Sequence, residues 1–529
     1  MSGRRGVKYC AWSGEFRGNN MKVLISRRVF AQSALAAGSA ALAGRTWGAC
    51  AEGFTAVGAA SAKVDDIEAL TTCGKQMILR GEDVQEFGKR LRGQLLLKNS
   101  DGYESARHVW NGAFDRRPAL IARCTGAADV MEAVKFAAER QLLVSVRGGG
   151  HSLSGQSVCE KGLMIDLAEL NAVRVDARRR IATVDGGALL GALDREALAH
   201  NLATTAGTVS HTGVGGLTLG GGFGRIGRKF GLTCDNVRSI DLVTARGQLV
   251  TASSEENKDL FWGLRGGGGN FGVATSFEFQ LHPVSAVMLG GDLAYSFEDA
   301  PAVLQHVFDY APQAPDELNL DVSLVRLPDD QRFLTIDVCW CGPWDAGEKA
   351  LASLRQIRKP MRDTVAPTPY VKLQTSGDEG TAHGHKYYIK GGFVQKSSPG
   401  LRDAMLAAIA EAKLPVITAV AMPQGGGAYA RVKPKATAFA QRAADHNVFL
   451  FSRWDDPALS DAVGEWTRAT WRKVEPHTRG FYVNEYSVDD ASRVEGTYGA
   501  NFARLRALKD AWDPNNLFRM NANVTPSGF

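Results

Sequence analysis

The stretch SVRGGGHSLSGQS, residues 145–157, places one histidine, His151, between three consecutive glycines and a Ser-x-Ser-Gly sequence. A lone histidine is more often a hydrogen-bonded structural residue than a functional one. Glycine, however, is needed where the backbone approaches another group closely or takes a positive φ. The first question is therefore what comes close to the backbone around His151.

Two further glycine clusters follow, at residues 213–224 and 266–272, and 59 of the 529 residues are glycine. The usual share of glycine is only ~7%. Loops of this kind present backbone N–H groups that bind phosphates. Because the three clusters alternate with predicted strands, we interpret them as the walls of one nucleotide site.

Two common nucleotide motifs do not fit the sequence. Gly267-x-Gly269-x-x-Gly272 has the spacing of the Rossmann fingerprint, but that fingerprint follows a strand and opens a helix. Here it follows a predicted helix over residues 255–267 and precedes an alternating strand over residues 273–281. The glycine-rich loop that ends in Lys-Ser or Lys-Thr in P-loop proteins is also missing.

Four long segments resemble FAD-linked oxidases of the berberine bridge enzyme-like family, within the p-cresol methylhydroxylase/vanillyl-alcohol oxidase superfamily. They are VRGGGHSLSG at 146–155, GTVSHTGVGGLTLGGGFGRIGRKFGLTCDNV at 207–237, LFWGLRGGGGNFGVATSFEFQLHPV at 260–284, and a C-terminal segment that begins YVNEYS at 482. The resemblance covers about residues 100–285 and 480–525. It implies an α+β fold, with a two-part FAD-binding domain of the p-cresol methylhydroxylase type and an α+β substrate domain with an antiparallel sheet.

The domain limits combine this resemblance with a change of composition near Pro283, after which glycines become rarer. We expect a FAD-binding domain at 100–285, a substrate-binding domain at 286–480, and a C-terminal segment at 481–529 that returns to the FAD-binding domain.

In the family, the histidine of the Arg-Gly-x-Gly-His motif is bonded covalently to the flavin 8α-methyl group, which implies the same role for His151. Residues that match the family's cofactor-binding positions are Arg147, Gly148, Gly149, Gly150, Ser152, Gly207, Thr212, Gly213, Gly216, Leu217, Gly220, Gly221, Gly222, Gly224, Val273, Asn484 and Asn521.

Many relatives hold the flavin by a second bond, from a cysteine in a Gly-x-Cys-x-x-Val-Gly-x-Gly motif. Val209 stands at that position, so we expect attachment through His151 alone and a smaller substrate. Thr212, at the family position that influences oxygen access, is close to valine in size, which favours O2 as the acceptor. The neighbouring His211 is either a site residue or a residue of a surface turn.

The resemblance implies hydride transfer from a substrate C–H bond, next to O or N, to flavin N5. A side chain accepts the neighbouring proton. Tyr482, of the family's Tyr-x-Asn motif, is the catalytic candidate, and Glu485 stands where relatives often carry a second tyrosine. Alternatives are a carbohydrate oxidase that forms lactones, a dehydrogenase that uses another electron acceptor, and a flavoprotein that binds its ligand without oxidising it.

Two groups of residues in the second domain could have either a functional or a structural role. Lys386, Tyr388 and Lys390 alternate along one predicted strand and share a face, which with Arg431 makes either a basic pocket or a solvated surface. His383 and His385 lack a third ligand at useful spacing, so no metal site is expected.

The N-terminal segment carries the basic excess of the chain. Of the formal net charge of +6, residues 1–49 supply eight Lys/Arg and one acid, which leaves 54 basic and 55 acidic residues and no electrostatic case for nucleic acid. Arg27 and Arg28 precede a run that stays uncharged to Gly44 and is too short for a membrane anchor. We predict a twin-arginine signal peptide over 1–51, with Met21 a candidate start, and export to the periplasm or beyond.

Overall fold

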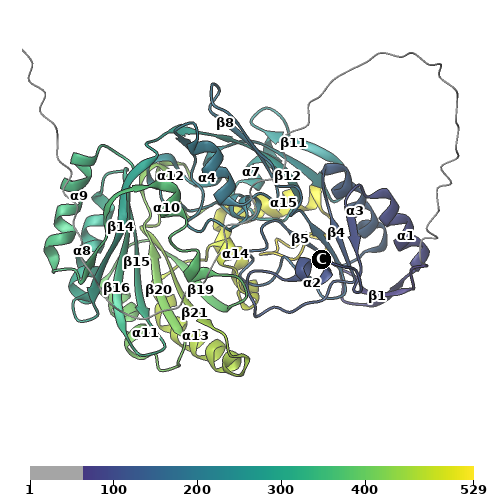
Figure 1. The fold of residues 1–529 in the computed structure, drawn as a ribbon. Helices are drawn as coiled ribbons and strands as arrows, with labels where there is room; N and C mark the ends of the chain where they lie inside the picture. Colours follow the sequence, from purple (N-terminus) through teal and green to yellow (C-terminus); the bar gives the residue numbers. More distant parts are fainter. Residues whose placement is uncertain (1–62) are drawn as a thin grey trace, which may run out of the picture. The chain divides into compact units, whose positions relative to one another are not determined.

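The structure is a computed structural model that describes residues 63–529. The predicted signal peptide, residues 1–51, lies outside the described residues. The described part forms three sheets of functional interest, arranged in two parts that the C-terminal segment connects (Figure 1).

The first part begins with a four-stranded sheet whose order is β3 (Gln94–Leu96), β4 (Leu120–Arg123), β6 (Leu163–Asp166) and β5 (Val144–Arg147). Strands β4, β6 and β5 run parallel. Helix α3 (Ala127–Arg140) buries Val130, Val134 and Ala137 against it, as the helical spacing predicts. Since ligands bind beyond the carboxyl ends of parallel strands, the loop that follows β5 is well placed for one.

The same core extends further towards the N-terminus than the predicted boundary at residue 100. A hairpin of β1 (Ile67–Leu70) and β2 (Gln76–Leu79) precedes α1 (Gly81–Arg90). Leu79, Val84 and Phe87 are buried with α3, and the rings of Phe87 and Phe136 stack at 4.3 Å between centroids. The segment resembles a polar stretch in sequence because its outer faces carry charged residues.

The second sheet is antiparallel, in the order β11 (Leu249–Ser253), β10 (Val237–Thr244), β12 (Gly272–Gln280), β8 (Ile181–Asp185) and β7 (Val173–Asp176). The predicted hairpin turn at Arg246-Gly247 is confirmed, with Gly247 at φ +67°. Gly272 opens β12 after helix α7 (Lys258–Leu264), which confirms that this glycine cluster is not a Rossmann loop. Helix α4 (Leu190–Leu198) also packs on this sheet.

The second part contains a large antiparallel sheet covered by helices (Figure 1). Its order is β17 (Arg362–Asp363), β14 (Val287–Ser296), β16 (Arg332–Trp340), β15 (Leu318–Arg326), β20 (Ile417–Pro423), β21 (His446–Trp454) and β19 (Lys386–Val394), with β18 (Ala366–Pro369) paired to β14.

Side chains of this large sheet alternate between two different environments. Leu318, Leu320 and Val322 of β15 are buried against an apolar layer. That layer comes from α8 (Ala300–Tyr310), α9 (Trp344–Ile357), α11 (Pro399–Ala410) and α13 (Ser460–Val474). Asn319 and Asp321 therefore point to the opposite face, towards the 207–232 segment.

The C-terminal segment returns from α13 to the first part. Helix α14 (Val494–Tyr498) and helix α15 (Phe502–Trp512) follow, and α15 packs against α7 (Figure 1). Leu505 and Leu508 are buried in one apolar cluster with Leu260 and Phe271. The predicted end of the last helix before Asp513-Pro514 is confirmed.

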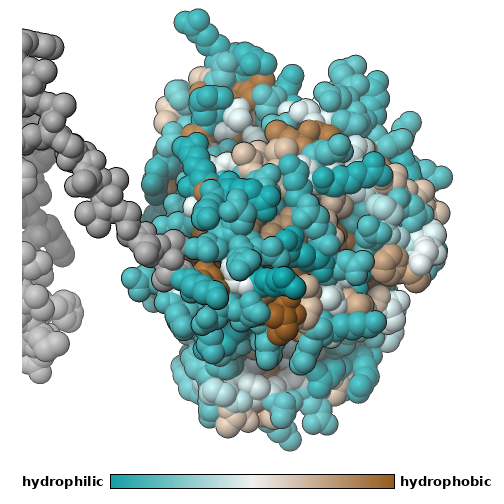
Figure 2. Space-filling view, turned by 90° about the vertical axis from the view of Figure 1, so that its right-hand side faces the viewer, coloured by the Kyte–Doolittle hydropathy of each residue, from teal (hydrophilic) through white to brown (hydrophobic). Residues whose placement is uncertain are grey.

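The surface of the described chain is mostly hydrophilic on the face shown in Figure 2, where apolar side chains form separate patches. Within residues 63–529, the longest apolar helical stretches fall short of what a membrane crossing requires.

A buried ion pair holds the end of α15. Lys509 and Asp513 are both fully buried, with 2.7 Å between Nζ and Oδ2. Lys509 Nζ also donates to the carbonyl oxygens of Asn270 and Phe518, and Asp513 accepts from the N–H groups of Leu517 and Phe518. The pair thereby ties the third glycine cluster to the C-terminal tail.

We expect Lys509→Met to lower the free energy of unfolding by about 3–5 kcal/mol, because it leaves the Asp513 carboxylate buried without its partner. Lys473→Met is the matched control. It removes an ion pair with Glu411 in which both side chains are more than half exposed, and exposed pairs contribute at most ~1 kcal/mol. Denaturant unfolding curves measure both changes, and equal losses in the two variants would contradict the expectation.

Candidate functional site

The loop that carries His151 packs directly against a second glycine loop. A Cβ atom on Gly149 would lie 2.5 Å from the backbone N and Cα of Gly213. The two chains therefore touch backbone to backbone, which only glycine allows at these two positions. Gly150 also has a positive φ of +67°, a conformation that favours glycine.

Five adjacent backbone donors in this loop remain free for a ligand. In the described part of the chain, no acceptor is bonded to the N–H groups of Gly148, Gly149, Gly150, His151 or Ser152. Successive free N–H groups form a nest suited to an anion, so the loop fits the pyrophosphate of FAD. Arg147 lies behind it, where its Nη1 donates to Ala106 O at 2.9 Å and lies 3.5 Å from Asp166.

His151 is held between an aromatic ring and a second histidine. Its ring stacks on Trp110 at 4.2 Å between centroids, and Trp110 stacks in turn on Tyr387. His151 Nε2 lies 3.1 Å from His211 Nδ1, so His211 belongs to the site and not to a separate surface turn. Burial, assisted by the nearby His211 and His383, lowers the pKa of His151 to about 3, which keeps its imidazole neutral at neutral pH.

His383 and His385 contact different neighbours. The His383 ring lies 5.1 Å from that of His211. His385 Nδ1 is instead 2.5 Å from Asp455 Oδ1. Over residues 63–529, no group of three or more His, Cys, Asp or Glu side chains is arranged to hold a metal ion.

A cavity of about 200 Å³ lies between the 207–232 segment and the polar face of the large sheet. Five of the predicted site residues line it: Gly207, Thr212, Leu217, Gly224 and Tyr482. From the sheet and its neighbours come Asn319, Asp321, Gln424, Asn447, Phe449 and Glu485.

Tyr482 and Asn484 are anchored to the second glycine cluster. The Tyr482 hydroxyl accepts from Gly222 N at 2.9 Å and from Asn484 Nδ2 at 2.6 Å. Asn484 Nδ2 also donates to Leu217 O at 3.0 Å. Burial raises the pKa of Tyr482 well above its ordinary value. The phenol is therefore protonated, and no acceptor among the described residues is bonded to its hydrogen.

The glycines of this second cluster differ in what surrounds them. A Cβ on Gly220 would collide with the Asn484 amide, one on Gly221 with the Phe439 ring, and one on Gly222 with Thr233. These three glycines thus make room for protein side chains. Gly216 instead faces open space.

Two predicted residues, Val273 and Asn521, lie outside both the cavity and the first two glycine clusters. Val273 is buried in the apolar core beneath α3, and its side chain does not line the cavity. Asn521 Nδ2 donates to Gly269 O at 3.1 Å and to Phe518 O at 3.1 Å, while its buried Oδ1 has no partner. It therefore contacts the third glycine cluster.

The sequence did not single out two carboxyl groups of the cavity as site residues. Glu485 is buried, and its Oε1 accepts from Asn447 Nδ2 at 2.7 Å. Its Oε2 has no hydrogen-bond partner within residues 63–529, and burial raises the pKa of Glu485 to about 8. Asp321 reaches the cavity from β15, where burial also raises its pKa. The alternation of β15 could have indicated Asp321, whereas only the place of Glu485 after the Tyr-x-Asn motif pointed to it.

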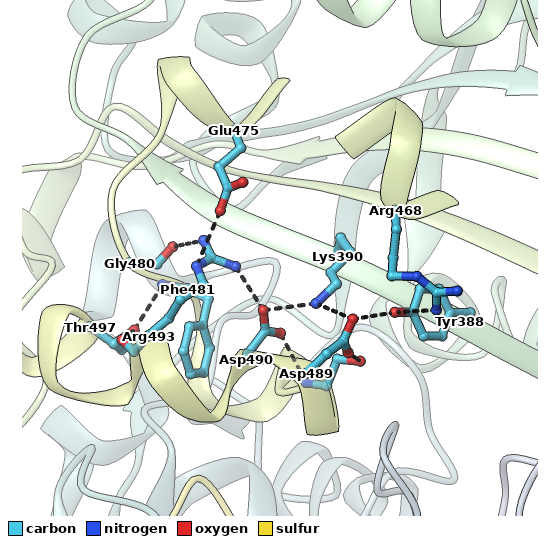
Figure 3. A network of polar contacts seen from close by, with 11 residues as sticks. Tyr388, Lys390, Arg468, Glu475, Gly480, Phe481, Asp489, Asp490, Arg493 and Thr497 are labelled. Carbon is cyan, nitrogen blue, oxygen red and sulfur yellow. Dashed lines mark hydrogen bonds and ion pairs between the residues drawn. The ribbon is translucent and has the colours of Figure 1, made fainter. Parts of the chain in front are cut away.

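The proposed basic pocket on β19 is wrong, and its alternative, a solvated strand face, does not describe Lys390. Lys390 is only 5% exposed, and its Nζ lies 3.0 Å from Asp489 and 2.9 Å from Asp490 (Figure 3). The Tyr388 hydroxyl donates to Asp489 at 2.7 Å, and Arg493 bonds Asp490. These contacts clamp the C-terminal segment to the sheet.

The other two cations of that hypothesis also have partners elsewhere. Lys386 Nζ donates to Asp455 O at 3.1 Å. Arg431 pairs with Asp316 at 2.5 Å, with its side chain 63% exposed. Neither side chain lines the cavity.

Two family models match this chain. The FAD binding domain matches residues 118–253, and the domain described as "Berberine and berberine like" matches residues 481–525. An FAD-linked oxidoreductase of Dictyostelium discoideum is 31% identical over 87% of this chain and 99% of its own length.

Solved structures agree with these matches. The 6-hydroxy-D-nicotine oxidase of Arthrobacter nicotinovorans superposes with a TM-score of 0.77 and 28% identity, covering 83% of this chain and 98% of that one. Xylooligosaccharide oxidase of Myceliophthora thermophila has a TM-score of 0.75 and 25% identity, covering 84% and 99%. With the glycine loops, His151 and the Tyr482–Asn484 segment in the arrangement described, the chain belongs to the FAD-linked oxidoreductases of the berberine bridge enzyme-like family.

Proposed function

We propose that the protein holds FAD covalently through His151 alone and oxidises a small organic substrate at a C–H bond next to O or N, with O2 as electron acceptor. The observation that carries the proposal is the environment of His151. A neutral, partly buried imidazole lies next to a nest of free N–H groups, and its Nε2 lies 3.1 Å from a second imidazole. A neutral imidazole is the nucleophilic form of histidine.

The chain's own residues divide the work in this proposal. The N–H groups of residues 148–152 bind the pyrophosphate, and Thr212 and Leu217 border the space that the ring and the substrate share. Bound FAD supplies the hydride acceptor. Tyr482 serves as a hydrogen-bond donor to the substrate, because its oxygen already accepts two hydrogen bonds and its pKa is raised.

The names of two similar proteins indicate which classes of substrate to consider. One acts on a hydroxynicotine and the other, by its name, on xylooligosaccharides. A cavity of about 200 Å³ favours the smaller of these, so a small organic molecule is the first choice. A lactone-forming carbohydrate oxidase is the second candidate.

We expect acid-precipitated protein to stay yellow and His151→Ala to release all of its flavin into the supernatant. Val209 stands where relatives carry a second attachment cysteine, so no other bond should retain the flavin. His200→Ala, at an exposed position of the same part, is the control and should keep its colour. Flavin that stays bound to precipitated His151→Ala would contradict a single attachment.

The identity of the electron acceptor can be tested in two steps. The flavin is first reduced with substrate in the absence of air, and the protein is then mixed with air-saturated buffer. With O2 as acceptor, absorbance near 450 nm should return within the turnover time, with one equivalent of hydrogen peroxide per flavin. Return only after addition of an artificial dye would favour a dehydrogenase.

The Arg27-Arg28 pair supports a further part of the proposal, export by the twin-arginine route after folding and flavin binding. Replacing both with lysine should leave the protein in the cytoplasm of its producing cell, with its flavin still bound. Fractionation of the cells measures this, and unchanged export would contradict the route.

A further inference from the structure

The large sheet, one wall of the cavity, carries a row of three neighbouring carboxyl groups, of which Asp321 lines the cavity. Asp292, Asp337 and Asp321 lie side by side on β14, β16 and β15, since Asp337 is the direct register partner of both others. Like charges directly opposite each other destabilise a sheet. Arg225 pairs with Asp337, and its charge partly offsets the burial that raises the pKa of Asp321. Asp321 faces the cavity and makes no ion pair of its own among the described residues.

A second carboxyl group of the cavity also lacks a cation. In the described part of the chain Glu485 Oε2 has no hydrogen-bond partner, and a Cβ on Gly391 of β19 would lie 2.5 Å from it. The missing side chain of Gly391 thus provides the space that this oxygen occupies. The adjacent Lys390 is directed to Asp489 and Asp490 instead (Figure 3).

The charges that surround Glu485 can be named from each neighbouring element. Tyr482 is on its own segment, Asp321 on β15, and Arg228 on the FAD-side wall. The Arg228 guanidinium donates to the carbonyl oxygens of Gly425 and Ala314 and forms no ion pair with Glu485 or Asp321. Among the described residues that line the cavity, carboxyl groups therefore outnumber cations.

The remaining lining is aromatic, aliphatic and amide in character. Phe223, Tyr429, Phe449, Leu217 and Leu232 supply apolar surface, and Asn319 and Asn447 supply amides. Aromatic faces next to carboxylates bind organic cations well.

We propose that this cavity takes a small organic amine, held as a cation between Asp321 and Glu485, and that Glu485 is the catalytic base that removes its N–H proton. The inference rests on the proposed function, whose substrate class it names. In its ionised form Glu485 accepts one N–H proton from the ammonium, which becomes a neutral amine. The neighbouring C–H bond then breaks, its electron pair and hydrogen leave as hydride to the flavin, and the product is a protonated imine.

The first test measures binding without turnover. Benzyltrimethylammonium has no N–H proton to lose, and benzyl alcohol is a neutral compound of related shape. We expect titration of the flavin-loaded protein to give at least tenfold tighter binding of the cation, and Glu485→Gln or Asp321→Asn to reduce that preference about tenfold. Equal affinity of the two compounds in the parent protein would overturn the proposal.

The second test follows anaerobic bleaching of the flavin by amines, alcohols of the same carbon skeletons, and xylobiose. Bleaching by amines supports the inference. Bleaching by alcohols or xylobiose alone overturns the inference but leaves the oxidoreductase proposal standing. If no compound bleaches the flavin although the cation binds, the oxidation and the role of Glu485 fail together.

The third test isolates the base. With a bleaching amine, Glu485→Gln should lower the rate of flavin reduction about 100-fold at pH 7 and remove the ionisation that controls this rate. Asp316→Asn, at the surface pair with Arg431, is the control and should leave the rate unchanged. An unaltered pH profile in Glu485→Gln would overturn the assignment.

A stability measurement tests the same group without catalysis. Its pKa of about 8 in the folded protein exceeds its ordinary value of 4.5, so folded protein binds the proton more tightly than unfolded protein. The contribution of Glu485 to stability is then full below about pH 4.5 and is lost as the pH rises towards 8. Glu485→Gln should therefore raise Tm at pH 8 relative to the parent and change it little at pH 5. A gain of the same size at both pH values would contradict a buried, ionisable Glu485.

Discussion

The backbone contact between Gly149 and Gly213 is the constraint on which the site depends. One loop follows the parallel strand β5 and the other precedes the short helix α5 (Val214–Leu219), so the two loops meet where neither has a side chain. This contact sets the distance between His151 and His211. It is supported from the second part of the molecule, because Asp378 accepts hydrogen bonds from the backbone and the hydroxyl of Ser210, next to His211.

The large sheet divides structural and chemical duties between its two faces. Its helix-covered face is apolar and can be packed densely, which leaves the other face free to carry groups that would be costly in a core. The row of carboxyl groups across β14, β16 and β15 is an example, because like charges on neighbouring strands destabilise a sheet. Placing unfavourable groups on one side of an otherwise stable sheet allows the cavity to have a strong electrostatic character without loss of the fold.

Local sequence patterns were sufficient for much of the fold. The periodicity of residues 127–140, the hairpin around Gly247 and the glycine that opens β12 are all short-range features, and the structure has them where the sequence predicts them. The segment before residue 100 was missed because its apolar side chains are separated by charged ones on the outer faces. The spacing of residues 386–390 correctly indicated a strand, but not that Lys390 is neutralised by residues about 100 positions later in the chain.

In the candidate site, too, local motifs could be recognised from the sequence, but contacts between distant segments could not. His151 and the Tyr482–Asn484 segment could be recognised because their motifs are contiguous. Glu485 and Asp321 could not be assigned, since what makes them notable is the absence of a partner, and that depends on segments which meet only after folding. Asn447, Gly391 and Lys390 define the surroundings of Glu485, and none of them is near it in sequence.

The space at Gly391 has a consequence for how members of this family diverge. Because Glu485 Oε2 occupies the volume that any side chain at position 391 would need, the two positions are coupled through a shared volume and not through a bond. A lineage that gains a side chain at 391 must shorten, turn or replace the residue at 485. The two positions should therefore covary, and a strand residue with no chemistry of its own becomes a marker of which relatives keep the carboxyl group.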